Sequence, residues 1–305
     1  AQHSTVADYH TSGAWVAVAI AGVASRMMGL TSTQTMHAMG IAEYHGPRSQ
    51  MMRCIDHPTM VKDGSGWGAM CGVSAARMAK AGFTGAPALT LQTEDWTDLG
   101  QDWLVEQQYF KPYPVCRWAQ APIEAVLDLK SRYNFNCKNV ASIHITSFHE
   151  AVRLGQKTAT NTEEAQYSTS FPCAVALVHG TILPEHVADD ALKDLEVQRL
   201  SSVLTMGENN HANSVFPNTR LARADITLTN GQVLESSWFE PKWDAKAPPT
   251  RTELTTKFQN YATPVLGVSR TQAIYNAVLE LDKTDTQNLF GLLAAPIRKA
   301  GTHVS

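Results

Sequence analysis

The 305-residue sequence has few cysteines, and their spacing excludes the usual cysteine-based sites. Their number is odd and they form no Cys-x-x-Cys pair; they are Cys54, Cys71, Cys116, Cys137 and Cys173. Neither a structural zinc site nor a disulfide framework is therefore predicted. An iron–sulfur cluster is also disfavoured, because it needs several cysteine ligands. Reduced thiols are the usual state in the cytoplasm, which is the location we expect.

Long apolar runs and an excess of charge of one sign are also missing. The most apolar stretch, 13–29, is interrupted by Arg26 and is rich in small residues, so it predicts a buried helix rather than a signal peptide or membrane span. The formal net charge of −3 gives no reason to expect nucleic-acid binding. Hydrophobic residues make up 44% of the chain and charged residues 17%, which is typical of a globular protein with a large core.

Helical signals fill the first hundred residues. Gly29 and the Gly46-Pro47 pair mark two helix ends, and residues 48–53 predict a loop or short turn. Capping residues and apolar spacing predict helices over 11–28, 31–45, 62–81 and 95–107.

The pattern changes after Tyr109. Lys111-Pro112-Tyr113-Pro114 cannot lie inside a helix. Farther along, Asn230-Gly231 is a strong hairpin signal between strands 223–229 and 232–236. The remaining patterns predict a strand over 140–146 and helices over 122–132, 171–180, 184–204 (an amphipathic pair) and 250–297.

We therefore predict a mostly α fold with an α+β part. An all-helical domain comprises residues 1–107 and 269–305, and a smaller α/β lid domain, residues 108–268, is inserted before the C-terminal helices. Limited proteolysis is expected to cut near residues 107–112 and 245–268.

The most informative stretch begins at Lys62, which stands at the entrance of the Gly/Ala/Ser-rich segment 64–76. Small residues let a second backbone approach closely, so this helix is expected in a crowded interior. A buried lysine needs an anionic partner, because an unpaired buried charge costs several kcal/mol. Lys62 is therefore a candidate for holding an anion. The alternative is a surface lysine whose aliphatic stem lies along apolar groups.

This stretch, followed by Gly82-Phe83-Thr84-Gly85, resembles the central signature of the MmgE/PrpD family, which includes 2-methylcitrate dehydratase, cis-aconitate decarboxylase and iminodisuccinate epimerase. Two further segments are similar and occur in the same order, Asp8-Tyr9-His10-Thr11-Ser12-Gly13 and Phe110-Lys111-Pro112-Tyr113-Pro114-Val115-Cys116-Arg117. The resemblance runs from about Asp8 to the C-terminus and is strongest over 8–125. It implies a helical domain with an α/β lid, an active site between them, a tendency to form homodimers, and no metal or organic cofactor.

The resemblance also implies a chemistry. Family members remove water or carbon dioxide from small polycarboxylates, or invert a centre beside a carboxylate. Negative charge then builds next to carboxylates, so the site needs fixed cations and a proton carrier with a pKa near neutrality. The resemblance implies His10 as the proton carrier and Lys62 and Lys111 as carboxylate clamps. The sequence does not choose among elimination, decarboxylation and epimerisation.

Each assignment has a structural alternative. His10 can cap a helix, and Lys111 can be an exposed lysine of an interdomain hinge. Arg117 and Arg48 are weaker candidates for substrate binding, and each can equally form a surface or structural pair. Tyr167 resembles a tyrosine that the family places near substrate, but it can also be ordinary aromatic core.

Two departures from the family pattern keep other functions open. Gln120 stands where many members have a histidine; an amide forms hydrogen bonds with substrate or protein but carries no proton. Members also have a helical segment before the position of Asp8, and a second chain is one source for it. We expect a lyase of the 2-methylcitrate dehydratase type, in propionate metabolism. The alternatives are a decarboxylase or epimerase of the family, a non-catalytic or partner-dependent subunit, and a different α/β enzyme.

Overall fold

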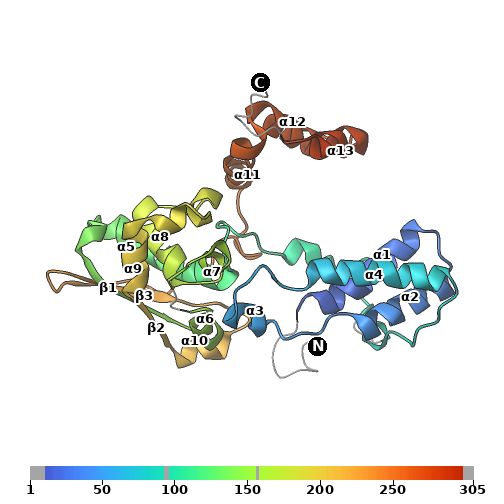
Figure 1. The fold of residues 1–305 in the computed structure, drawn as a ribbon, viewed down its shortest axis with the longest axis horizontal. Coiled ribbons are helices and arrows are strands. Elements are labelled where there is room, and N and C mark those ends of the chain that lie inside the picture. Colours follow the sequence, from blue (N-terminus) through green and yellow to red (C-terminus); the bar gives the residue numbers. More distant parts are fainter. Residues whose placement is uncertain (1–10, 93–95, 156–157, 298–305) are drawn as a thin grey trace.

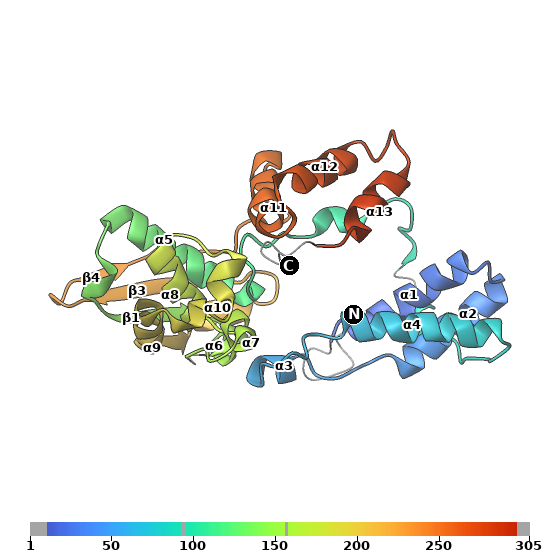
Figure 2. The same cartoon turned by 45° about the horizontal axis from the view of Figure 1, so that its top comes forward.

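The computed structural model describes residues 11–92, 96–155 and 158–297, and all structural statements refer to these ranges. The fold is mostly α with an α+β part, as the sequence predicts. Three groups of elements are separated in space (Figures 1 and 2). The N-terminal helices lie at one end, a small sheet with its helices lies at the other, and the last three helices project from the middle.

The N-terminal group is a bundle of α1 (Gly13–Met27), α2 (Ser32–His45) and α4 (Ser65–Lys80) around an alanine-rich core. The glycines of α4 allow close contact with α1, because a Cβ on Gly72 would lie 2.5 Å from the carbonyl oxygen of Ala17. The expected close approach of a second backbone is confirmed. The opposite face of α4 exposes Trp67 and Met70, however, so only one side of this helix lies in a crowded interior.

The segment that leads out of the bundle differs from the prediction. The expected helix over 95–107 is wrong: its described part consists of turns and a short 3₁₀ helix, Leu104–Gln107, and Trp96, Leu99, Trp103 and Leu104 are exposed. Gly100 has a φ of +84°, which a continuous α-helix does not allow. A short helix without a packing partner is marginal in water, so apolar spacing alone does not produce one here.

A four-stranded mixed sheet forms the centre of the α+β part, in the order β2-β1-β3-β4. The central strand β1 (Val140–Ser147) pairs in parallel with β2 (Leu204–Glu208) and antiparallel with β3 (Arg223–Leu228). The predicted hairpin at Asn230-Gly231 is confirmed, since β3 pairs antiparallel with β4 (Val233–Glu235).

Helices cover this sheet and bury a large apolar core that includes Ile143, Phe148 and Phe171. Residues 48–53, expected as a loop or turn, lead into the short α3, which packs against this part. Where two amphipathic helices were expected over 184–204, the structure has two 3₁₀ turns and one α-helix. The helices are α3 (Met52–Asp56), α5 (Gln120–Tyr133), α6 (His149–Leu154), α7 (Thr162–Gln166), α8 (Ser170–His179), α9 (Leu195–Ser202) and α10 (Asn210–Val215). The other 3₁₀ helices are Leu89–Leu91, Arg117–Ala119, Cys137–Asn139, Pro184–Val187 and Ala191–Lys193.

The C-terminal group consists of α11 (Arg251–Leu266), α12 (Val268–Leu279) and α13 (Thr286–Ala294). Thr250 starts α11 with a capping box, in which its hydroxyl accepts from the backbone N–H of Glu253. α12 packs against both α11 and α13. The assignment of residues 269–305 to the same domain as residues 1–107 stays a prediction. Within the described ranges, no helix combines the length and hydrophobicity needed to cross a bilayer.

Candidate active site

A pocket of about 330 Å³ lies where the start of α1 and α3 meet the α+β part. Three of the predicted site residues line it, namely Lys111, Arg117 and Tyr167. The other lining residues come from five separate segments of the chain: Ser12, Trp15, Met51, Cys54, Ile55, Asp63, Tyr109, Cys116, Trp118, Phe216, Pro217 and Arg220. The fold therefore gathers residues that are more than 200 positions apart in sequence, such as Ser12 and Arg220, into one cavity.

Lys62 lies beside this pocket and faces one of its walls. Its Nζ donates a 2.9 Å hydrogen bond to Oε1 of Gln166, at the end of α7, and lies 5.1 Å from the centre of the Tyr167 ring. Burial lowers the pKa of Lys62 from its ordinary value, and the carboxylate of Glu163 opposes the shift in part. The half-buried ammonium is thus held by a neutral amide and an aromatic face, which leaves it able to attract an anion.

Lys111 lies on an irregular strap, 109–116, that bends at residues 112–115 and leads from the bundle to α5. The lysine is exposed, and its positive charge acts to lower the pKa of Cys116, although burial raises that pKa overall. Two residues of α11 hold the strap from its other side: Nζ of Lys257 donates to the carbonyl oxygen of Lys111, and the hydroxyl of Tyr261 donates to that of Pro112 at 3.4 Å. The position of Lys111 therefore depends on α11.

Arg117 is buried, with only 4% of its side chain exposed, and most of its donors are already used. Nη1 donates to the carbonyl oxygens of Phe110 at 3.0 Å and Lys242 at 2.8 Å, and Nη2 forms a 3.1 Å ion pair with Asp244. Burial lowers the pKa of Arg117, and its hydrogen bond to Asp244 opposes this shift. Arg117 contributes positive charge to the pocket wall while it fixes two segments of backbone.

Gln120 and Arg48 lie outside the lining of this pocket. Gln120 is fully buried behind the wall, where its amide nitrogen donates to the backbone carbonyls of Tyr113 and Val115 at 3.3 and 3.4 Å. Arg48 is exposed in the connection between α2 and α3. Neither residue lines the pocket beside Lys111 and Tyr167, and their roles toward substrate stay predictions.

His10, the predicted proton carrier, falls outside the described residues. The residues that follow it are anchored at the pocket: the backbone N–H of Thr11 donates to Ser49 at 2.8 Å, and that of Ser12 donates to Oδ1 of Asp63 at 2.8 Å. Asp63 thereby accepts from the first turn of α1 and fixes it against the start of α4. A neighbouring pocket of about 450 Å³ shares Cys54 and Asp63 with this one and is lined by Thr11.

Arg220 is the main site residue that sequence reasoning missed. It lines the pocket, and its Nε is buried without a hydrogen-bond partner among the described residues. Its positive charge acts to lower the pKa of Arg117, so the two guanidinium groups lie close to each other. No local pattern marks Arg220, because it follows the irregular stretch after α10 and reaches the pocket only through tertiary folding.

The arrangement is suited to bind a small anion. The pocket lining carries three cationic side chains, Lys111, Arg117 and Arg220, and one carboxylate, that of Asp63. Lys62 lies beside the pocket and adds a fourth positive charge. Burial also raises the pKa of Tyr167 to about 12, so its hydroxyl stays protonated and can donate to a bound oxygen. Within the described ranges, no cluster of three or more His, Cys, Asp or Glu residues could hold a metal ion.

Comparison with known proteins places both halves of the chain in one family. The model of the MmgE/PrpD N-terminal domain matches residues 1–108, and that of the MmgE/PrpD C-terminal domain matches residues 113–283. A cis-aconitate decarboxylase of Aspergillus terreus is 24% identical over 95% of this chain and 65% of its own length. A probable 2-methylcitrate dehydratase of Saccharomyces cerevisiae is 25% identical over 64% of this chain and 42% of its own length. The chain thus spans less than two thirds of these relatives, and it belongs to the MmgE/PrpD family.

Proposed function

We propose that the chain is a lyase that acts on a small polycarboxylate, by elimination of water in the manner of a 2-methylcitrate dehydratase. The observation that carries this proposal is the convergence of Lys111, Arg117 and Arg220 in one pocket of about 330 Å³. That volume is near the lower end of the roughly 300–1,000 Å³ usual for small-molecule sites. Membership of a family with relatives named as a dehydratase and as decarboxylases supports the same class of reaction.

The substrate's carboxylates would bind to cations of different character. A guanidinium offers a planar pair of donors to a carboxylate, whereas an ammonium acts as a compact point charge. Both Arg117 and Arg220 have a buried Nε without a hydrogen-bond partner among the described residues, but other donors of Arg117 already hold backbone carbonyls. Lys111 would approach from the strap, where its exposed side chain has freedom to follow the substrate as it binds.

Proton transfer would take place on the side of Lys62 and the first turn of α1. In the elimination, a base removes a proton from the carbon beside a carboxylate, and the hydroxyl group leaves with a proton as water. We propose His10 as the proton carrier and Lys62 as the cation that stabilises the enolate oxygen. No cofactor enters this scheme, since the chain's own cations supply the stabilisation of negative charge.

Decarboxylation is the second candidate. The resemblance to a relative named cis-aconitate decarboxylase extends over 95% of this chain, against 64% for the relative named as a dehydratase. In this reaction, the carbon–carbon bond to one carboxylate breaks, carbon dioxide leaves, and the resulting carbanion takes up a proton. The step needs one proton donor and no leaving hydroxyl, so the same cations could serve it.

We propose further that the protein works in the cytoplasm, in propionate metabolism, as a homodimer. All five cysteines are free, as expected in a reducing compartment. The exposed apolar side chains Trp15, Met27, Trp67 and Met70 on the bundle support an interface there.

Proton NMR in deuterated buffer tests the reaction. The purified chain would be incubated with 2-methylcitrate, citrate, cis-aconitate and iminodisuccinate, beside the variants Lys62→Ala and Lys193→Ala. Lys193 is an exposed lysine of the α+β part and serves as the matched control. We expect loss or exchange of a substrate proton in the wild type and in Lys193→Ala, and neither in Lys62→Ala. Turnover that is unchanged in Lys62→Ala would contradict the assigned role, and silence with all four compounds would contradict the lyase proposal.

A further inference from the structure

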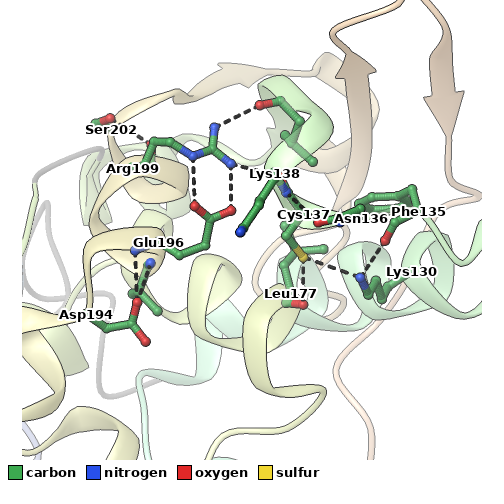
Figure 3. A network of polar contacts seen from close by, with 12 residues as sticks. Lys130, Phe135, Asn136, Cys137, Lys138, Leu177, Asp194, Glu196, Arg199 and Ser202 are labelled. Atoms are coloured by element: carbon green, nitrogen blue, oxygen red, sulfur yellow. Dashed lines mark hydrogen bonds and ion pairs between the residues drawn. The ribbon is translucent and has the colours of Figure 1, made fainter.

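A lysine and a cysteine meet at the end of α5, outside the lining of the proposed active site (Figure 3). Nζ of Lys130 lies 3.4 Å from Sγ of Cys137, within hydrogen-bonding distance for sulfur. Both side chains are half-buried, so small oxidants in solution can reach them. The pair has no part in the proposed reaction.

The local fold produces this contact. α5 ends at Tyr133, and Asn134 has a φ of +43°, which reverses the direction of the chain. The carbonyl oxygen of Phe135 then accepts a 2.6 Å hydrogen bond from Nζ of Lys130. The 3₁₀ helix that follows begins at Cys137 and returns beside the last turn of α5. The lysine is therefore held at the place where the thiol arrives.

The thiol is also held. The guanidinium of Arg199 donates to the carbonyl oxygens of Cys137 at 2.8 Å and Val140 at 2.9 Å, and Glu196 accepts from the same guanidinium (Figure 3). Sγ of Cys137 donates to the carbonyl oxygen of Leu177 in α8 at 3.1 Å. With its backbone and its sulfur both fixed, the cysteine stays in contact with Lys130.

The other cysteines lack this arrangement. All five lie in the described ranges, and Cys137 is the one whose sulfur accepts a hydrogen bond from a lysine. Burial raises the pKa of Cys54, Cys116 and Cys173, which makes these thiols less reactive. Sγ of Cys71 donates to a backbone carbonyl at 3.5 Å. Among the five cysteines, Cys137 is therefore the one placed to react with a lysine.

We propose that Lys130 and Cys137 form a reversible covalent bridge, Nζ–O–Sγ, when the protein is exposed to molecular oxygen. One N–H and the S–H bond break, an N–O and an O–S bond form, and the second oxygen atom leaves as water. Dioxygen accepts four electrons in this step, two hydrogen atoms pass to the water, and the amine reacts in its neutral form. Two equivalents of a dithiol reverse the step, which returns the amine and the thiol and releases the bridging oxygen as water.

The bridge would join the last turn of α5 to the segment that enters β1. It would replace the hydrogen bond between Nζ and Sγ by two covalent bonds and close a short loop around Asn134, so this end of the α+β part would become more resistant to opening. The proposed active site contains neither residue, and this inference does not rest on the proposed lyase activity.

Peptide mass spectrometry of the whole chain tests the bridge. Protein kept in oxygen-saturated buffer is digested with trypsin and compared with protein reduced by dithiothreitol. The bridge blocks cleavage after Lys130 and links peptide 118–132 to peptide 133–138, with a gain of one oxygen atom and a loss of two hydrogen atoms. We expect this species only in the oxidised sample. Its absence there, or an oxidised Cys137 beside normal cleavage after Lys130, would overturn the proposal.

Three variants make the result specific. Lys130→Arg keeps the positive charge and the donor to Phe135 but lacks the amine, and Cys137→Ser lacks the sulfur, so neither should give the linked peptides. Cys71→Ser is the matched control and should give them as the wild type does. Linked peptides with the same gain of one oxygen atom and loss of two hydrogen atoms in Lys130→Arg would show that another group reacts and would overturn the assignment.

Discussion

The contacts of Arg117 predict how much its replacement lowers the stability of the protein. Its side chain is 4% exposed and donates to two backbone carbonyls, those of Phe110 and Lys242, and to the carboxylate of Asp244. These bonds join the strap, 109–116, to the segment before α11. The change Arg117→Met removes all three while it retains most of the apolar stem.

The expected loss of stability follows from the individual hydrogen bonds of Arg117. A hydrogen bond from a charged group contributes about 1.5–3 kcal/mol, and the two carbonyls of Phe110 and Lys242 lose theirs. The desolvation cost of the buried guanidinium disappears at the same time, which offsets part of that loss. Asp244 is 46% exposed and regains water, so its ion pair contributes less than about 1 kcal/mol. We expect Arg117→Met to lower the free energy of unfolding by about 2–4 kcal/mol and Asp244→Asn by less than about 1 kcal/mol.

Urea titration followed by tryptophan fluorescence measures both changes, with far-UV circular dichroism as the second probe. Arg132→Met is the control, because Arg132 is exposed and water can replace both its ion pair with Asp128 and its 3.1 Å hydrogen bond to the carbonyl oxygen of Glu235, so its loss should shift the unfolding midpoint far less. The reasoning is refuted if Arg117→Met is as stable as the control. If Asp244→Asn lowers the free energy of unfolding as much as Arg117→Met does, then the ion pair, and not the backbone contacts, stabilises the strap.

Three further predictions concern the bundle and the site. Gly72→Ala should destabilise the bundle by about 1–3 kcal/mol in thermal unfolding, because its Cβ would lie 2.5 Å from a carbonyl of α1, whereas Gly66→Ala, with no atom within 4 Å, should cause no loss. Lys62 binds an anion only as a cation, and burial lowers its pKa below the ordinary 10.5, so substrate affinity should fall as the pH rises through that lowered pKa. In Lys62→Arg, the loss of substrate affinity at alkaline pH should move to higher pH. Identical pH profiles of affinity for Lys62→Arg and the wild type would contradict the role of Lys62. Lys257→Met should raise KM or lower kcat, because it frees the strap that holds Lys111, and unchanged kinetics would show that α11 does not position this lysine.

Features set by neighbouring residues could be predicted from the sequence. The capping boxes at Thr31 and Thr250 start α2 and α11 within one residue of the prediction, because each cap needs only a partner three positions away. The hairpin at Asn230-Gly231 is as local. The glycines of α4 also indicate a close helix contact correctly, although they do not show that the opposite face stays exposed.

Features that depend on distant contacts could not be predicted. β2 (Leu204–Glu208) is short and gains its strand pairing only from β1, about sixty residues earlier in the chain. The helix expected over 95–107 has no surface to pack on, so its apolar spacing has no structural consequence. Arg220 enters the pocket without any sequence signal. The sequence also does not show that the hydrogen-bond partner of Lys62 in the fold is the amide of Gln166, and the role of Lys62 toward an anion stays a prediction.

The binding of a non-reactive tricarboxylate, tricarballylate, tests the central claim most directly. Isothermal titration calorimetry would compare the wild type with Arg220→Met and with the exposed-arginine control Arg132→Met. We predict saturable binding to one site that weakens by roughly tenfold or more in Arg220→Met, since a lost charge-assisted pair is equivalent to at least about 1.4 kcal/mol, and that is unchanged in Arg132→Met. Failure of the wild type to bind, or equal affinity in all three proteins, would contradict the assignment of this pocket as the polycarboxylate site.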